Sequence, residues 1–283
     1  MPPKPSITVL GSLNADIVPY VPHHPHPGET ITATCLARGP GGKGANQAVA
    51  CARLADPCSP VHVAMVGAVG DDADGRMLLS SLRESSVDTS AVRSCEGSQT
   101  GVAVVIVDEM DKQNRIIVSP EANHELGPGH VLGLEADLLL VQLEIRLETV
   151  LAAIRASTSP VLLNAAPAPE PLPRDIYPHI THLIVNESEA ATLATSNDGS
   201  LLSDEAGLRL VTQRFQDWGV ANVVITLGER GVFYAAAGGE AALIPAEEVD
   251  VVDTTAAGDT FVGAYALAVV GGQDGRGGGQ GGE

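Results

Sequence analysis

The sequence predicts an α/β fold with a mostly parallel central sheet flanked by helices. Short apolar runs rich in Val, Leu and Ile alternate with segments of helical periodicity along most of the 283 residues. Continuous apolar runs of this kind are typical of parallel strands, which are buried on both faces. No internal repeat and no linker divides this pattern, so we expect one large domain.

The alternation starts near the N-terminus, where ITVLG (7–11) predicts a strand and GANQAVACARL (44–54) predicts a helix. Two strand-and-helix pairs follow: VHVAMVG (61–67) with DGRMLLSSLRES (74–85), and ADLLLVQLE (136–144) with LETVLAAIRAS (147–157). The rest of the pattern consists of strands VLLN (161–164), THLIV (181–185) and NVVITLG (222–228), with helices NESEAATLA (186–194) and EAGLRLVTQRFQDWG (205–219).

Two segments depart from the alternation and predict a small antiparallel β lid. DIVPYV (16–21) with ETITATCLA (29–37), and TGVAVVIVDEM (100–110) with NRIIVS (114–119), are typical of hairpins with interleaved polar residues. We expect these lid strands, from about residues 14–40 and 98–120, to stand off the main sheet.

The C-terminal segment GGQDGRGGGQGGE, residues 271–283, has no periodicity and almost no apolar content. This composition predicts a Gly-rich flexible tail that follows directly on an apolar helix at 258–270. The predicted organisation is therefore an α/β domain over residues 1–270 and a tail over residues 271–283.

Charge and composition narrow the class of function. A net charge of −19 argues against a nucleic-acid or anionic-membrane partner, because phosphate backbones need a basic face. The four cysteines show no C-x-x-C spacing, so reduced thiols are expected. The apolar run near the N-terminus is too short and too broken for a signal peptide, and no stretch approaches the length of a membrane span. We expect a cytoplasmic protein, with the nucleus possible in a eukaryote.

The stretch GPGGKGANQAVACARL (39–54) places Lys43 between glycines at a helix start. It is not a P-loop, because Ala37 occupies the first glycine position and Gly44 follows the lysine. Two interpretations stay open. The glycines serve only a turn into a helix, or they let the backbone approach a small ligand toward which Lys43 and Asn46 point.

The stretch VDTTAAGDTFVGAYALAVV (252–270) combines a strand end, three small residues and an acid. Free N–H groups at an unobstructed helix start form an anion hole, and Asp259 belongs to the first turn beside it. Asp259 is either a helix-capping residue or the proton acceptor of a phosphoryl transfer to a hydroxyl.

Other motifs are weaker. NESE (186–189) offers Asn186 and Glu189 as oxygen donors for hydrated Mg²⁺, although a capped helix start has the same pattern. TLGERG (226–231) has the glycines of a nucleotide-contacting loop. HHPH (23–26) lacks a further ligand pattern, so no metal is expected there. DDADG (71–75) predicts a helix cap rather than a calcium loop.

Five motifs in order resemble those of the ribokinase-like (PfkB) family of carbohydrate kinases. The resemblance runs from about residue 7 to about residue 270. It rests on GSLNAD (11–16), PGET (27–30), GGKGANQAVA (41–50), QLE (142–144) and AAGDTF (256–261).

The resemblance implies ATP-dependent phosphorylation of D-ribose at its 5-hydroxyl to give ribose 5-phosphate. It implies Mg²⁺ and K⁺ as cofactors and a homodimer paired through the lid strands. Two alternatives stay open: a kinase for another pentose such as deoxyribose, and a C-terminally truncated sugar-binding homologue with impaired catalysis.

Site residues are carried over position by position. The resemblance implies that Asp259 is the base and that the backbone of Ala256, Ala257 and Gly258 is the anion hole. It implies that the sugar is surrounded by Asn14, Asp16, Gly41, Gly42, Lys43, Asn46, Glu144 and Asp259.

The resemblance also implies nucleotide and metal positions. Asn186 and Glu189 match the element associated with magnesium, and Asp253 and Thr255 match part of a potassium site. The nucleotide side is matched by Asn186, Thr226, Gly228, Gly231 and Gly258. In the family, further helices and a loop follow the AAGD helix, wall the adenine and complete the potassium shell. Because the Gly-rich segment stands in their place, we expect sugar binding to survive and ATP binding to be weak.

Overall fold

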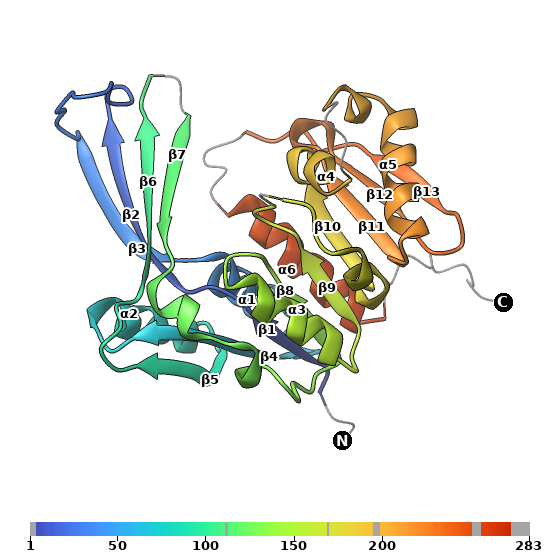
Figure 1. Ribbon diagram of the computed structural model, residues 1–283, viewed down its shortest axis with the longest axis horizontal. Coiled ribbons are helices and arrows are strands. Elements are labelled where there is room, and N and C mark those ends of the chain that lie inside the picture. The colour runs from blue at the N-terminus through green and yellow to red at the C-terminus, as the bar shows by residue number, and fades with distance from the viewer. Residues whose placement is uncertain (1–3, 111–112, 169, 195–198, 251–255, 273–283) are drawn as a thin grey trace.

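The computed structural model describes residues 4–110, 113–168, 170–194, 199–250 and 256–272, and all but the first two residues of the predicted tail lie beyond them. Within these ranges the chain folds into a large sheet covered by helices and a second, smaller sheet that stands off it (Figure 1). The α/β fold with a lid is thus confirmed. None of the described helices is both long and apolar enough to cross a membrane.

The large sheet has nine strands in the order β13-β12-β11-β10-β9-β8-β1-β4-β5. Strands β11 to β5 in this order pair in parallel, and β12 and β13 add an antiparallel edge. The bounds are β1 Ser6–Leu10, β4 His62–Gly70, β5 Asp88–Cys95, β8 Leu138–Val141, β9 Val161–Asn164, β10 His182–Asn186, β11 Asn222–Thr226, β12 Val232–Ala235 and β13 Ala241–Ile244.

Six α-helices lie among the described residues, and they cover both faces of this sheet. Their bounds are α1 Lys43–Leu54, α2 Ala73–Glu84, α3 Leu147–Ala156, α4 Glu187–Leu193, α5 Glu205–Asp217 and α6 Ala257–Val270. Short 3₁₀ segments are Glu121–Glu125 (η1), Pro128–His130 (η2), Arg174–His179 (η3), Gly199–Leu202 (η4) and Gly228–Arg230 (η5).

Each face of the sheet carries its own apolar core. Along β8, Leu139 and Val141 contribute to the core under α3 and α5, and Leu138 and Leu140 contribute to the core under α1, α2 and α6. All four side chains are buried, as expected for a strand covered on both sides. This is the physical reason why the apolar runs in the sequence are continuous rather than alternating.

The lid is a four-stranded sheet in the order β3-β2-β6-β7 (Figure 1). Its strands are β2 Asn14–Val21, β3 Cys35–Gly41, β6 Gly101–Asp108 and β7 Asn114–Ser119. The outer pairs β2–β3 and β6–β7 are antiparallel, as the two hairpins predict, whereas the middle pair β2–β6 is parallel. The first strands of the two hairpins are β2, which follows β1, and β6, which follows β5. Both leave the main sheet at the same edge, so they run side by side in one direction.

Three strands of the main sheet were not predicted. β5 has the polar sequence DTSAVRSC at one edge of the sheet, and β12 and β13 are four-residue strands at the other. β5 is an edge strand with one neighbour and less covered surface, so its side chains need no apolar pattern. β12 (VFYA) and β13 (AALI) are apolar, but four residues are too few to show a period. The cap predicted for DDADG is confirmed, because the Asp72 side chain accepts from the Gly75 N–H at 2.7 Å.

Helices α1 and α6 pack closely against each other (Figure 1). Gly263 in α6 allows this approach, since a Cβ there would lie 2.6 Å from Ala50 Cβ and 3.0 Å from the Cys51 nitrogen of α1. Cys51 is buried and donates through Sγ to the Gly263 carbonyl at 3.8 Å. These contacts, further along both helices, hold the first turns of α1 and α6 close together.

We expect Gly263→Ala to lower the free energy of unfolding by about 1–3 kcal/mol, because the added methyl group overpacks the α1–α6 contact. Urea denaturation measures the change. Gly129→Ala is the matched control, because a Cβ at Gly129 meets nothing within 4 Å. Equal stability of the two variants would contradict a close-packed contact at Gly263.

Candidate active site

The predicted site residues meet at one edge of the main sheet, where its parallel strands end. Ser12 follows β1, Glu144 follows β8, and Asn164, Asn186 and Thr226 are the last residues of β9, β10 and β11. Carboxyl ends of parallel strands share an edge, and this edge is where open α/β sheets bind ligands. Residues that are more than two hundred positions apart in the sequence thus become neighbours.

The Gly-rich stretch connects the lid to α1 and approaches the start of β2 closely. Gly42 has φ 90°, and a Cβ there would lie 2.7 Å from the Asn14 nitrogen. A Cβ at Gly41 would lie 2.1 Å from Asp16 Oδ2. Both glycines are thus required by close approach, Gly42 also by its left-handed conformation. The stretch does more than turn into a helix.

Lys43 begins α1, and its backbone N–H donates to Glu144 Oε2 at 3.0 Å. The same carboxylate oxygen accepts from the Ser12 hydroxyl at 2.6 Å. Glu144 therefore joins the end of β1, the end of β8 and the start of α1. The Lys43 side chain lines a cleft that also contains Glu189 and Asp259.

Asn14 lies buried at the start of β2, and its side-chain oxygen accepts from Asn123 Nδ2 at 2.8 Å. Asn123, in η1, also accepts from the Leu13 N–H at 2.9 Å and donates to the Leu13 carbonyl at 3.1 Å. Asn123 was not predicted. It fixes the turn that carries Asn14 from a segment about 110 residues later in the chain.

Three carboxylates converge on the same space. The pKa of Asp16 is raised from 3.8 to about 6. Burial is the largest cause, and the negative charges of Glu144 and Asp259 are the next. A cluster of acids with donors around it can accept several hydroxyl hydrogen bonds. Such a cluster is unfavourable to a phosphate and favourable to an uncharged polyol.

Asp259 lies in the first turn of α6 and is only 8% exposed. Its Oδ2 accepts from Asn46 Nδ2 at 3.1 Å, and its Oδ1 accepts from Gln47 Nε2 at 2.9 Å. Both donors belong to the first turns of α1. The Asp259 side chain therefore faces the cleft and α1 and does not cap its own helix, which favours the second interpretation of this acid.

The start of α6 has the geometry of an anion site. Ala256, the N-cap residue, is left-handed with φ 56°, and no side chain caps the helix. A non-glycine residue in this conformation costs about 1–3 kcal/mol and is typical of functional turns. Ala256, Ala257 and Gly258 line the cleft with Asp259, so small residues surround the first N–H groups.

A buried amide network behind Asp259 was not predicted either. Gln47 Nε2 donates to Asn164 Oδ1 at 2.9 Å as well as to Asp259, and Gln47 Oε1 accepts from Gln142 Nε2 at 2.6 Å. Asn164 in turn donates to the Ile184 carbonyl at 3.3 Å. One sequence signal could have identified these two glutamines. Gln47 lies next to Asn46 in GGKGANQAVA, and Gln142 lies two residues before Glu144 in QLE.

The cleft has a volume of about 190 Å³ and extends from Asp259 to the ends of β10 and β11. It is lined by Lys43, Asn164, Ala166, Ile184, Val185, Asn186, Glu189, Thr226, Ala256, Ala257, Gly258, Asp259 and Val262. Gly228 and Gly231, also predicted on the nucleotide side, lie just past Thr226 at the two ends of η5.

Asn186 and Glu189 form a reciprocal capping box at the start of α4. The Glu189 N–H donates to Asn186 Oδ1 at 2.9 Å, and the Asn186 N–H donates to Glu189 Oε2 at 2.8 Å. The pKa of Glu189 is raised, and burial is the largest cause. The Asn186 N–H and the nearby Lys43 charge lower it by less than burial raises it. The capping interpretation is confirmed, and the carboxylate still lines the cleft.

The donor set on this side fits a hydrated Mg²⁺, because Glu189 and Asn186 provide hard oxygens near Lys43 and Asp259. The predicted potassium residues Asp253 and Thr255 lie outside the described residues.

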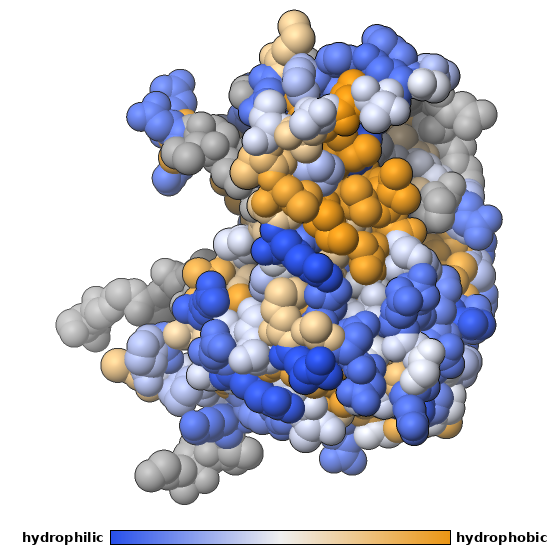
Figure 2. All heavy atoms as spheres, turned by 90° about the vertical axis from the view of Figure 1, so that its left-hand side faces the viewer, coloured by the Kyte–Doolittle hydropathy of each residue, from blue (hydrophilic) through white to orange (hydrophobic). Residues whose placement is uncertain are grey.

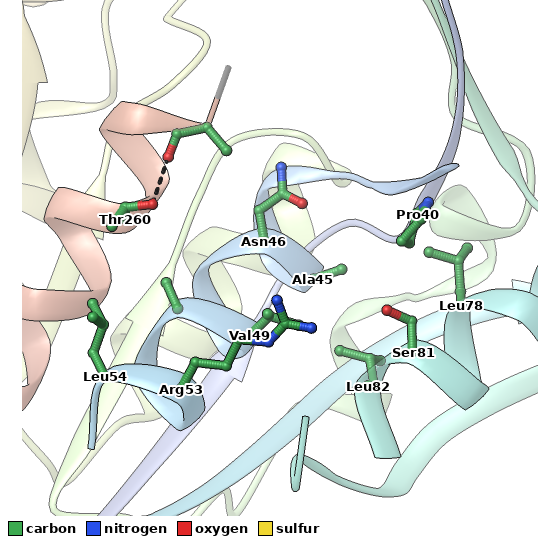
Figure 3. A pocket seen from close by; sticks show the side chains of 12 residues that line it. Pro40, Ala45, Asn46, Val49, Arg53, Leu54, Leu78, Ser81, Leu82 and Thr260 are labelled. Carbon is green, nitrogen blue, oxygen red and sulfur yellow. Dashed lines mark hydrogen bonds between the residues drawn. The ribbon is translucent and has the colours of Figure 1, made fainter. Parts of the chain in front are cut away.

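A second groove, of about 380 Å³, lies beside the cleft between α1, α2 and the start of α6 (Figure 3). Asn46 lines this groove as well as facing Asp259, and Ala256 lines both cavities. Apolar residues such as Val49, Leu78 and Leu82 make up much of its wall (Figure 3). The Asn46 amide thus lies between the polar cleft and an apolar groove.

The sequence of the chain is similar to those of known proteins. The family model described as pfkB family carbohydrate kinase matches residues 4–278. The chain is 41% identical to the ribokinase of Schizosaccharomyces pombe and 38% identical to that of Bacillus subtilis. Each alignment covers 95% of this chain, and 86% and 87% of the two relatives. It is 33% identical to the deoxyribokinase of Salmonella typhi over 92% of this chain and 84% of that protein.

Solved structures agree. A ribokinase from Thermotoga maritima superposes with a TM-score of 0.83 at 33% identity, covering 95% of this chain and 87% of that one. The Arabidopsis thaliana ribokinase complexed with ribose and ATP gives a TM-score of 0.80 at 31% identity, with the same coverage.

The raised pKa of Asp16 makes stability depend on pH. Because the folded value of about 6 exceeds the ordinary 3.8, ionisation of Asp16 opposes folding. The stabilising effect of the protonated form is complete below about pH 4 and is lost as pH rises through 6. Asp16→Asn should therefore raise the free energy of unfolding at pH 8 by about 1 kcal/mol, discounted for partial exposure, and change it little at pH 4.

Urea unfolding of parent and variant at both pH values measures this difference. Asp217→Asn, at the end of α5, is the surface control and should show no pH-dependent difference. If Asp16→Asn keeps the parent's pH dependence, the carboxylate cluster does not strain the fold.

Proposed function

The chain belongs to the pfkB family of carbohydrate kinases, and we propose that it transfers the terminal phosphoryl group of ATP to the 5-hydroxyl of ribose, giving ribose 5-phosphate. The observation that carries this proposal is Asp259, held by two amides beside an uncapped helix start and facing a carboxylate cluster. The relatives named ribokinase, 41% and 38% identical over most of the chain, support ribose as substrate.

Sugar binding would use the cluster at the base of the lid. Asp16 and Glu144 accept hydrogen bonds from sugar hydroxyls, and Asn14 and Asn46 offer amide groups. Gly41 and Gly42 have no side chain, which lets the backbone of this stretch lie against Asp16 and Asn14. Lys43, at the boundary of the cleft, provides a positive charge between the sugar and the nucleotide side.

Phosphoryl transfer needs a proton acceptor and a place for negative charge. Asp259 accepts the proton of the attacking 5-hydroxyl, which bonds to phosphorus as ADP leaves. The N–H groups of Ala257 and Gly258 donate to the oxygens of the transferring group, whose charge the α6 dipole also favours. Asn46 and Gln47 hold the Asp259 carboxylate in place during this step.

The nucleotide would lie along the ends of β10 and β11, near Asn186, Thr226, Gly228 and Gly231. Mg²⁺, which neutralises phosphate charge when bound, would be held through water by Glu189 and Asn186. The Arabidopsis relative was solved in complex with ribose and ATP, which supports these two ligands as the substrates.

Deoxyribose is the second candidate substrate, supported by the 33% identity to a deoxyribokinase. The carboxylates of Asp16 and Glu144 at the base of the lid accept hydrogen bonds from hydroxyls, which favours a sugar that keeps its 2-hydroxyl. Steady-state rates with the two sugars at equal concentration distinguish the candidates.

We also propose a homodimer paired through the lid. Leu36 on β3 and Ile116 and Ile117 on β7 are 58–65% exposed, and hydrophobic side chains gather on the outer side of the lid (Figure 2). An exposed apolar patch of this kind is typical of an interaction surface. Sedimentation equilibrium, which should give twice the chain mass, tests the dimer.

Asp259→Asn should lower turnover by about 10²–10⁴-fold and leave ribose affinity nearly unchanged, because the amide keeps the shape but cannot accept the proton. A coupled ADP-release assay and calorimetry with ribose measure the two effects. Asp71→Asn, an exposed acid at the start of α2, is the control. Near-normal turnover in Asp259→Asn would exclude Asp259 as the base.

Asp16→Ala should weaken ribose binding by about 1–3 kcal/mol, which corresponds to roughly 5–150-fold in Kd, since hydroxyl partners are left unpaired. Calorimetry with ribose alone measures this without requiring ATP. Binding as tight as in the parent would place the sugar elsewhere.

Potassium dependence is proposed from Asp253 and Thr255. The ion would orient the turn before α6 without contacting substrate. We expect a lower rate when potassium is replaced by tetramethylammonium at constant ionic strength, and an unchanged rate would exclude a functional potassium site.

A further inference from the structure

The tip of the lid brings two histidines and a glutamate together. His23, His26 and Glu29 belong to the loop between β2 and β3, and their ligand atoms all lie within 4.8 Å of one another. His24, the remaining histidine of HHPH, is not part of this cluster, and both of its ring nitrogens are buried, so a third ligand must come from outside the motif. The loop supplies it by folding back so that Glu29 Oε1 lies 3.1 Å from His23 Nε2.

The loop is anchored on the lid, so the cluster is positioned rather than free. The His24 N–H donates to Asp108 Oδ2 at 2.9 Å, and Asp108 is buried at the end of β6. The Glu29 carboxylate also accepts from the His26 N–H at 2.8 Å. These bonds hold the backbone around His23 and His26 before any ion binds.

The distances suit a small transition metal ion. Two ligands about 2.1 Å from a tetrahedral zinc ion lie about 3.4 Å apart. His23 and Glu29 are close to this spacing at 3.1 Å, and the ligand atom of the exposed His26 ring lies within 4.8 Å of both. Two imidazoles and one carboxylate favour Zn²⁺, Co²⁺ or Ni²⁺ and disfavour Mg²⁺, which prefers oxygen ligands.

We propose that His23, His26 and Glu29 form a binding site for a divalent transition metal ion at the tip of the lid, distinct from the magnesium of the phosphoryl transfer. The ion joins the end of β2 to the middle of the connecting loop and leaves a coordination position open to water. The negative net charge of the chain, −19, attracts cations in general and so aids association.

The test is a titration of the full chain with Zn²⁺ alone in competition with a chromophoric chelator. One ion per chain is expected, and His23→Ala or His26→Ala should weaken its binding by about tenfold or more. His124→Ala, an exposed histidine of η1 outside the cluster, is the matched control and should bind as the parent does. A large excess of Mg²⁺ should not displace the ion.

Three results would overturn the site: no saturable binding by the parent, full binding by the His23→Ala/His26→Ala double variant, or an equal loss in His124→Ala. Circular dichroism of each variant checks that it is folded. Substitution of Co²⁺ gives a second readout, because tetrahedral cobalt has intense visible absorption that should disappear in His26→Ala.

A separate observation concerns Gln47, and it rests on the function proposed above. Gln47 is fully buried, and each of its polar atoms is engaged: the amide nitrogen with Asp259 and Asn164, and the oxygen with Gln142. Because a carboxylate oxygen only accepts, the NH₂ group must face Asp259. The donor from Gln142 holds the other end of the amide in that orientation.

We infer that Gln47 is a positioning residue for phosphoryl transfer, acting through the Asp259 carboxylate. Gln47 donates to Oδ1 of Asp259 and Asn46 donates to Oδ2, so each amide holds one oxygen of the base. The remaining lone pairs of Asp259 stay available for the sugar hydroxyl. A residue that only filled space would need no amide at this position.

Gln47→Glu tests this, because it keeps the shape and places a second carboxylate against Asp259. The acid limb of the rate profile should move to higher pH by about one unit, since a like charge opposes ionisation. Gln47→Leu should lower turnover by about 10–100-fold with the ribose KM nearly unchanged. Thr212→Val, which removes a buried hydroxyl in α5, controls for lost stability and should keep the parent's pH profile.

An unchanged pH profile in Gln47→Glu, together with normal turnover in Gln47→Leu, would overturn the inference. Failure of the parent to phosphorylate any pentose would instead contradict the proposed function. In that event the titration of the Asp259 carboxyl carbon, followed by NMR in the parent and in Gln47→Glu, still decides whether Gln47 acts on this carboxylate, and identical midpoints would exclude it.

Discussion

The contact between the first turns of α1 and α6 is the constraint on which the site depends. Asn46 and Gln47 from one helix hold Asp259 of the other, and Gly263 lets the two helices approach closely further along. The parallel sheet brings both helix starts to the same edge. Without this approach, Asp259, the uncapped start of α6 and the proposed sugar pocket would be separate features of distant segments.

The acidic pocket is maintained against its own repulsion. Asp16, Glu144 and Asp259 lie close enough for burial and mutual charge to raise the pKa of Asp16 to about 6. The surrounding donors, such as Ser12 to Glu144 and the amides to Asp259, offset part of that cost. A pocket strained in this way gains from a ligand that brings hydroxyl donors, so sugar binding and relief of repulsion are the same event.

The order of strands and helices, the lid and most site residues were predictable, because continuous apolar runs and the motifs around Lys43 and Asp259 are local patterns. Three elements escaped for a physical reason. The edge strand β5 is polar, and the apolar strands β12 and β13 have only four residues each, too few to show a period. The amides of Gln47, Gln142 and Asn123 act through partners about 95–212 residues away, and only the fold reveals such pairings.

The lid links the two regions of greatest chemical interest. β2 begins at Asn14 in the sugar pocket and ends at Val21, next to the histidine loop, while β3 returns from that loop to Gly41 and Lys43. Because paired strands transmit displacement along their length better than a loop does, an ion that orders the tip also restrains the strands that carry Asn14 and Asp16. The parallel pairing of β2 with β6 widens this restraint to the second hairpin. Order at the tip and order in the pocket are therefore expected to change together.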